Sequence, residues 1–203
     1  MDDHPNSDAD FPAAQPRAVV RLSASGLTVG TKLITPAGER CVEDLKRGDR
    51  VLTKDFGYQQ IKCVAFRDAD LRLSDTQAPI KISENALGHT RPAADVYVSP
   101  TQRIALRHPL FEPIFGGREV VAQAGDLLDL AGVDQVSGLR GITYVLLGFT
   151  RPQLVLTGSL VFDLGGQDLT SARPVLSNTE ARLACSMLAP QPAVIGPQGQ
   201  PLH

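Results

Sequence analysis

Few side chains in this sequence could do chemistry, and they are widely spaced. The three cysteines, Cys41, Cys63 and Cys185, are scattered and odd in number, which fits neither a zinc motif nor a disulfide framework. We expect them to be small buried apolar residues, and the sequence leaves open whether Cys41 and Cys63 could pair. The internal histidines, His89 and His108, stand next to turn residues and are expected in surface loops.

Acidic residues gather in one short segment, at Glu43, Asp44 and Asp49. Such a cluster fits either a metal site or the caps and turns of a loop, and we favour the caps and turns. Asp126 and Asp129 flank two leucines and are expected on the wet face of a short helix. The sequence therefore predicts neither a bound metal nor a cofactor.

Length and composition indicate one globular domain. The chain has 203 residues, 42% of them hydrophobic, and its 20 basic and 22 acidic side chains give a net charge of -2. That balance argues against nucleic-acid binding by bulk electrostatics. No apolar run approaches the roughly 20 residues of a membrane span, and the acidic start lacks a signal peptide's features, so we expect a cytoplasmic protein. The expected boundaries are a tail at 1–16, a domain at 17–190 and a Pro-rich tail at 191–203.

The pattern of short apolar runs predicts an all-β fold. Eighteen glycines and fifteen prolines punctuate these runs, and the strongest strand candidates are residues 141–149 and 154–164. A hairpin is expected to turn at residues 55–57. Two segments have helical spacing: a turn or two within 119–133, and one short C-terminal helix at 177–189.

The order of these pieces resembles the Hint domain, the Hedgehog and intein autoprocessing fold, in its alphaproteobacterial form. The resemblance begins with Gly30–Thr31, the turn at 36–38, and the segments VEDL at 42–45 and GDRVLT at 48–53. It continues through residues 79–88, 96–106, 142–160 and 173–184, and so covers roughly residues 24–190. It implies a curved, all-β fold with pseudo-two-fold symmetry.

Active members of this family cleave their own backbone. A residue at the start of the domain attacks the preceding carbonyl, and histidines on adjacent strands assist. At the matching positions this chain has Gly26 for the nucleophile, Gln102 for the histidine of the block that starts at Ser99, and Leu146 and Pro152 for further histidines. Glycine has no side chain, and an amide does not exchange protons near neutral pH.

These substitutions predict a catalytically degenerate Hint domain that is not an enzyme. By elimination, we expect a protein-interaction or assembly component that binds a protein partner through its tails or the former active-site cleft. The resemblance does not indicate an oligomeric state. The alternative is self-cleavage with a non-standard nucleophile, Ser25 or Thr28, either of which would still need a base.

Overall fold

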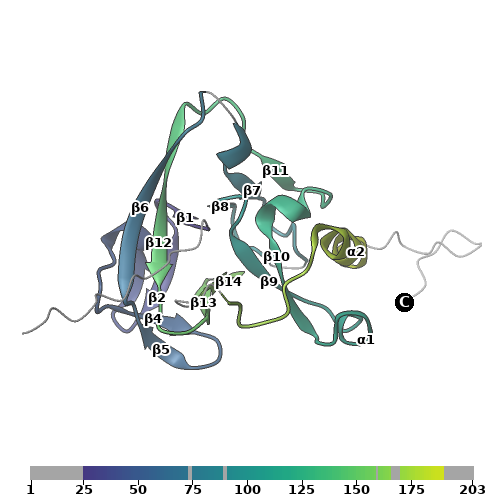
Figure 1. Ribbon diagram of the computed structural model, residues 1–203, viewed down its shortest axis with the longest axis horizontal. Coiled ribbons are helices and arrows are strands. Elements are labelled where there is room, and N and C mark those ends of the chain that lie inside the picture. Colours follow the sequence, from purple (N-terminus) through teal and green to yellow (C-terminus); the bar gives the residue numbers. More distant parts are fainter. Residues whose placement is uncertain (1–24, 73–74, 89–90, 159, 166–169, 190–203) are drawn as a thin grey trace, which may run out of the picture.

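A computed structural model describes residues 25–72, 75–88, 91–158, 160–165 and 170–189. Within these ranges the chain is built mostly of antiparallel strands, in two six-stranded sheets and a separate hairpin (Figure 1). The prediction of an all-β fold is therefore confirmed. The tails predicted at 1–16 and 191–203 lie outside the described residues.

Each sheet mixes strands that are distant in sequence. The first sheet, in spatial order, contains β11 (Val133–Gln135), β7 (Ile80–Ile82), β8 (Val96–Val98), β1 (Leu27–Thr28), β12 (Gly141–Gly148) and β6 (Cys63–Asp70). The second contains β10 (Glu119–Gln123), β9 (Arg103–Arg107), β14 (Leu160–Leu164), β13 (Gln153–Thr157), β4 (Arg50–Thr53) and β5 (Gly57–Gln60). The separate hairpin pairs β2 (Lys32–Thr35) with β3 (Gly38–Cys41).

Helices are short and lie at the margins. The α-helices are α1 (Phe111–Phe115) and α2 (Asn178–Leu188), and the 3-10 helices are η1 (Val42–Asp44), η2 (Asp75–Gln77) and η3 (Ala124–Leu127). The predicted C-terminal helix is thus confirmed as α2. The helical expectation for 119–133 holds only for η3, because the residues before it form β10 and bury Val120 and Val121 beside β9.

Strand β12 contributes to two separate clusters of buried side chains. Alternate residues of a strand point to opposite faces, so Val145 and Leu147 join the main core while Tyr144 and Leu146 join a smaller cluster. The smaller cluster is completed by Ala69, Leu71 and Ala78. Both faces of β12 are therefore filled, and β12 is held firmly between β1 and β6.

The hairpin predicted to turn at residues 55–57 is confirmed, because residues 54–56 connect β4 to β5. The prediction of one strand at 154–164 is wrong, because the chain turns between Thr157 and Leu160 and β14 pairs antiparallel with β13. Among the described residues, no helix is long and apolar enough to cross a lipid bilayer.

Helix α2 depends on its first turn. Ser177 and Glu180 form a capping box, in which each side chain accepts a hydrogen bond from the other residue's backbone N–H. We expect Ser177→Ala to lower the free energy of unfolding by about 1 kcal/mol, because it leaves an N-terminal amide without its partner. Chemical denaturation checks this, with Ser186→Ala on the exposed face of α2 as the control. Equal stability of the two variants would contradict the expectation.

Candidate functional site

The start of β1 is joined to the segment after β8 by a pair of hydrogen bonds. The backbone N–H of Gly26 donates to the Ser99 hydroxyl over 3.0 Å, and the backbone N–H of Ser99 donates to the Gly26 carbonyl over 3.1 Å. Both residues are buried. The structure thus brings together two of the positions singled out from sequence. Hydrogen bonds to Ser99 hold both the N–H and the C=O of Gly26.

Gly26 has no room for a side chain. A Cβ atom built on it would lie 2.7 Å from the Cβ of Tyr144, and real Cβ atoms essentially never come that close. The contact follows from the pairing of β1 with β12, in which Leu27 faces Val145 and Thr28 faces Tyr144. A residue larger than glycine therefore requires β1 or β12 to shift.

Tyr144 is itself tightly held. Its ring is fully buried, its hydroxyl donates to the Gln77 carbonyl over 2.6 Å, and the Arg67 guanidinium lies 5.0 Å from the ring centre. Burial raises the pKa of Tyr144 to about 12, although the charge of Arg67 acts in the opposite direction. At neutral pH the phenol is protonated and cannot act as a base.

Gln102 is buried close to Ser99. Its backbone N–H donates to the Ser99 carbonyl over 2.9 Å, and its side-chain Nε2 donates to the carbonyls of Arg103 and Asp163. The Oε1 atom of Gln102 has no hydrogen-bond partner among the described residues. An amide held by backbone carbonyls has a structural role here and has no proton to exchange near pH 7.

The other two positions matched to family histidines, Leu146 and Pro152, have apolar side chains. Leu146 is buried in the smaller cluster, and the β1–β12 register, continued by one residue, sets it opposite Gly26. Pro152 lies past the end of β12, in the connection to β13. Leu146 is thus the cross-strand neighbour of Gly26, whereas Pro152 lies directly before β13.

The two alternative nucleophiles, Ser25 and Thr28, lie just before β1 and at its end. The Thr28 hydroxyl donates to the Tyr97 carbonyl over 2.8 Å, and a carbonyl cannot take the proton. Ser25 is buried at the start of the described chain. His108 follows β9 at the end away from Gln102, six residues further on, which is roughly 20 Å along an extended strand. His89 lies outside the described residues.

His108 belongs to the local structure of α1. Its Nδ1 accepts a hydrogen bond from the backbone of Leu110, and its ring centre lies 5.5 Å from that of Phe111. It is half-buried, in a loop as the sequence predicts.

The acidic segment serves caps and turns, as predicted. Glu43 accepts two hydrogen bonds from the backbone N–H of Gly30, and Asp49 accepts one from Lys46 and one from Arg40. Among the described residues, no group of three His, Cys, Asp or Glu side chains could hold a metal ion.

The cysteines are all free thiols. Cys185 is buried on α2 as expected, whereas the expectation of burial is wrong for Cys41 and Cys63, which are only half-buried. Burial raises the pKa of the Cys185 thiol to about 11, and the charges of Asp129 and Asp126 add to the rise. The Cys185 thiol is therefore protonated at neutral pH and is a poor nucleophile.

A comparison with protein families matches residues 25–163 to the Hint domain. The chain belongs to the Hint domain family. The match begins one residue before Gly26, and it includes β1, β12 and the Ser99–Gln102 segment. A search of curated proteins finds no match.

Solved structures similar to this Hint domain are inteins and an intein-like domain. An inactive variant of the AceL NrdHF class 3 split intein is 18% identical, with a TM-score of 0.46, over 69% of this chain and 97% of the intein. A bacterial intein-like domain from Clostridium thermocellum is 12% identical, with a TM-score of 0.48, over 70% of this chain and 99% of that domain.

Sequence reasoning identified Gly26, Ser99 and Gln102 but missed Tyr144. Its position in the run at 141–149 indicates only a strand residue, and no local signal marks it as the neighbour of Gly26. The pairing that joins them spans more than 110 residues of sequence, so it depends on the register of the whole sheet.

The close approach of Gly26 to Tyr144 makes a quantitative prediction. Gly26→Ala should lower the free energy of unfolding by about 1–3 kcal/mol, the usual cost of overfilling a packed core. Gly117→Ala is the matched control, because its added Cβ would meet nothing closer than 3.6 Å. Denaturant titration of both variants measures the difference. A Gly26→Ala variant as stable as the parent would show that the two strands are not in tight contact.

Proposed function

We propose that this Hint domain does not cleave its own chain and that it acts by binding, as a protein-interaction or assembly component. The observation that carries the proposal is Gly26, which stands at the family's nucleophile position with its peptide group hydrogen-bonded to Ser99 and its side-chain space closed by Tyr144.

Backbone cleavage of the family's kind needs three groups around one carbonyl carbon. An oxygen or sulfur must attack the carbonyl of the preceding residue, a base must take its proton, and a donor must stabilise the oxyanion. Here the attacking position is Gly26 and the proton-transfer positions are Gln102, Leu146 and Pro152. None of these four side chains can be the nucleophile or move a proton at neutral pH.

The Ser99 hydroxyl, which is hydrogen-bonded to Gly26, is also unsuited to attack. Its oxygen accepts the N–H of Gly26, and the Thr101 hydroxyl oxygen lies 3.4 Å from it. Neither group is a base. The arrangement supports a structural role for Ser99, whose hydrogen bonds to Gly26 join the start of β1 to the end of β8.

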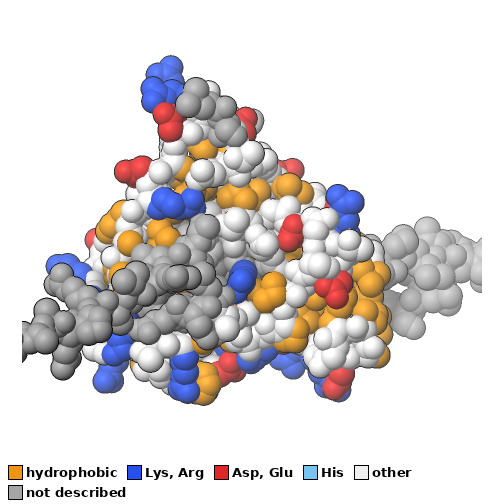
Figure 2. Space-filling view, viewed as in Figure 1, with side chains coloured by type: hydrophobic (Ala, Val, Ile, Leu, Met, Phe, Trp, Pro, Cys, Tyr) orange, Lys and Arg blue, Asp and Glu red, His pale blue; other side chains and the backbone are white. Residues whose placement is uncertain are grey.

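Exposed apolar side chains support the binding role. Figure 2 shows such side chains gathered on the side that carries α1 and α2, where Leu110, Ile114 and Leu183 are each about half exposed. A second feature is a cleft of about 410 Å³ next to the former active site, lined in part by Thr28, Val29 and Tyr97. Exposed apolar patches of this kind are typical of protein-binding surfaces. We propose a protein partner rather than nucleic acid, given the net charge of -2.

Intact-mass spectrometry tests the absence of cleavage. A full-length chain carrying tags at both ends should keep a single mass through prolonged incubation from pH 6 to pH 9, with or without added thiol or hydroxylamine. A Ser25→Ala, Thr28→Ala double variant, which removes both alternative nucleophiles, is the control and should behave identically. A fragment that ends at residue 24, 25 or 27 in the parent, and not in this control, would overturn the proposal.

The double variant Gly26→Cys, Gln102→His separates loss of chemistry from loss of the scaffold. We expect it to remain largely uncleaved, because the new Cβ at residue 26 collides with Tyr144. Efficient cleavage by this variant would mean that β1 and β12 separate readily. The parent chain would then be inactive only because it lacks the nucleophile and the histidine. The same mass measurement reports the result.

A further inference from the structure

Strand β6 is a long strand with an unpaired edge. It spans Cys63–Asp70 and is hydrogen-bonded on one side to β12 along its whole length, and within the described residues no strand pairs with its other side. Figure 1 shows it at the outer margin of the sheet. On it, Phe66 is 57% exposed, more than any other large apolar side chain among the described residues. An exposed edge of this length is a template for pairing with another strand.

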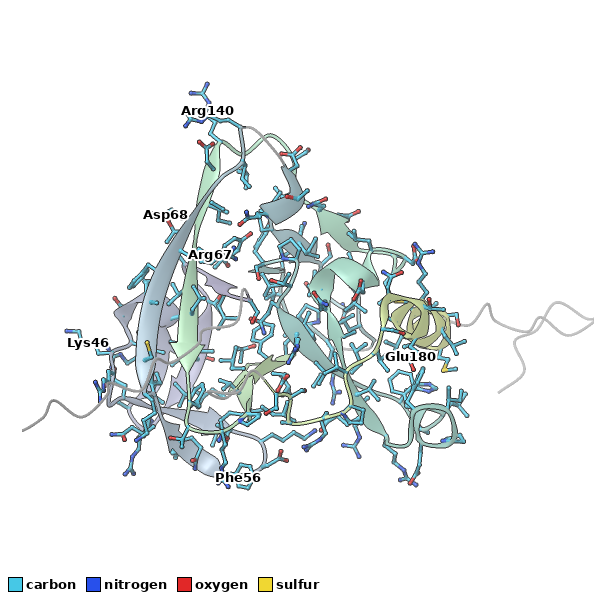
Figure 3. All side chains as sticks on the ribbon, in the orientation of Figure 1. Lys46, Phe56, Arg67, Asp68, Arg140 and Glu180 are labelled. Atoms are coloured by element: carbon cyan, nitrogen blue, oxygen red, sulfur yellow. The ribbon has the colours of Figure 1, made fainter. Side chains whose placement is uncertain are left out.

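The register with β12 shows which backbone groups face outward. Leu71 N–H donates to the Arg140 carbonyl, so bonded pairs recur at every second residue, including Arg67 with Tyr144. The residues between them, Val64, Phe66 and Asp68, therefore direct their N–H and C=O groups away from β12. Their side chains share one face of the ribbon, and Figure 3 shows Arg67 and Asp68 on opposite sides of it.

The sequence of this edge is complementary to itself. When two copies of β6 are placed antiparallel about a two-fold axis at Ala65, Val64 of each copy faces Phe66 of the other. Lys62 precedes β6 and donates its backbone N–H to the Gly148 carbonyl, so it lies outside the new ladder and only its side chain approaches Asp68 of the other copy. Aromatic pairs with β-branched residues and pairs of opposite charge are the favourable cross-strand combinations. The outward N–H and C=O groups of Val64 and Phe66 become bonded pairs in this register.

Neighbouring registers are less favourable. An axis at Phe66 pairs the two Phe66 side chains, which is favourable, but it sets Val64 of each copy against Asp68 of the other. An axis at Arg67 sets the two Arg67 side chains against each other. Each places an apolar group beside a charge or two like charges together. The outward-facing backbone groups allow only registers that pair even-numbered residues, so the axis at Ala65 is the best of this small set.

We propose that this chain forms a homodimer by antiparallel pairing of β6 edges about a two-fold axis at Ala65, which joins the first sheets of two copies into one. The proposal gives a definite partner, a second copy, to the interaction role proposed above, and it rests on that role. It does not depend on the state of the Gly26 site, because β6 and Gly26 lie on either side of β12.

Light scattering coupled to size-exclusion chromatography tests the dimer across a concentration series. The parent chain should show twice the mass of one chain at high concentration. Phe66→Lys removes both Val64–Phe66 contacts and should raise the dissociation constant about tenfold or more. Tyr58→Lys, on the exposed edge strand β5 of the other sheet, is the matched control and should leave the mass unchanged. The mass of one chain at every concentration would overturn the proposal, as would a dimer that Phe66→Lys leaves intact.

A disulfide tests the register. At a non-bonded pair the two Cα atoms are about 4.5 Å apart, within disulfide range, and Ala65 faces its own copy at such a pair. In a chain with Cys63→Ser, Ala65→Cys should therefore form a covalent dimer on mild oxidation, whereas Tyr58→Cys should not. Absence of the Ala65→Cys dimer would exclude this register and the proposal with it. The mass test for self-cleavage is separate, so a monomeric chain would leave that conclusion unaffected.

Discussion

The contact between Gly26 and Tyr144 is the constraint on which the site depends. Because the Cβ of Tyr144 occupies the place of a side chain at residue 26, β1 can lie close against β12. That approach also positions the Gly26 peptide to exchange hydrogen bonds with Ser99. Active members of the family have a nucleophilic side chain at the matching position. In this chain Tyr144 occupies the space that such a side chain would need.

The packing of β12 explains why this arrangement is stable. Tyr144 and Leu146 fill the smaller cluster on one face, and Val145 lies in the main core on the other. A side chain at residue 26 would therefore collide with Tyr144 and disturb the smaller cluster. The absence of a side chain at residue 26 and the close packing of β1 against β12 are therefore physically linked.

Much of the fold could be predicted from the sequence because its signals are local. Turn residues marked the β4–β5 hairpin, and Ser177 with Glu180 marked the start of α2. Residues 154–164 were predicted as one strand, but they form the two strands of the β13–β14 hairpin. The turn of helix expected within 119–133 is η3, and the residues before it form β10 because they pair with β9. The identities of Gly26 and Gln102 were visible in the sequence, but the role of Tyr144 was not. It arises from a cross-strand contact between distant segments, which no local pattern encodes.

Hydrogen exchange at the backbone amide of Gly26, followed by NMR, tests the closed site most directly. The amide is buried and bonded to the Ser99 hydroxyl, so we predict that it exchanges as slowly as the amides of the central strands, through global unfolding. Ser99→Ala should accelerate it specifically. Exchange as fast as that of an exposed loop in the parent chain would show that the start of β1 opens to solvent, and it would contradict the account of a site closed by packing.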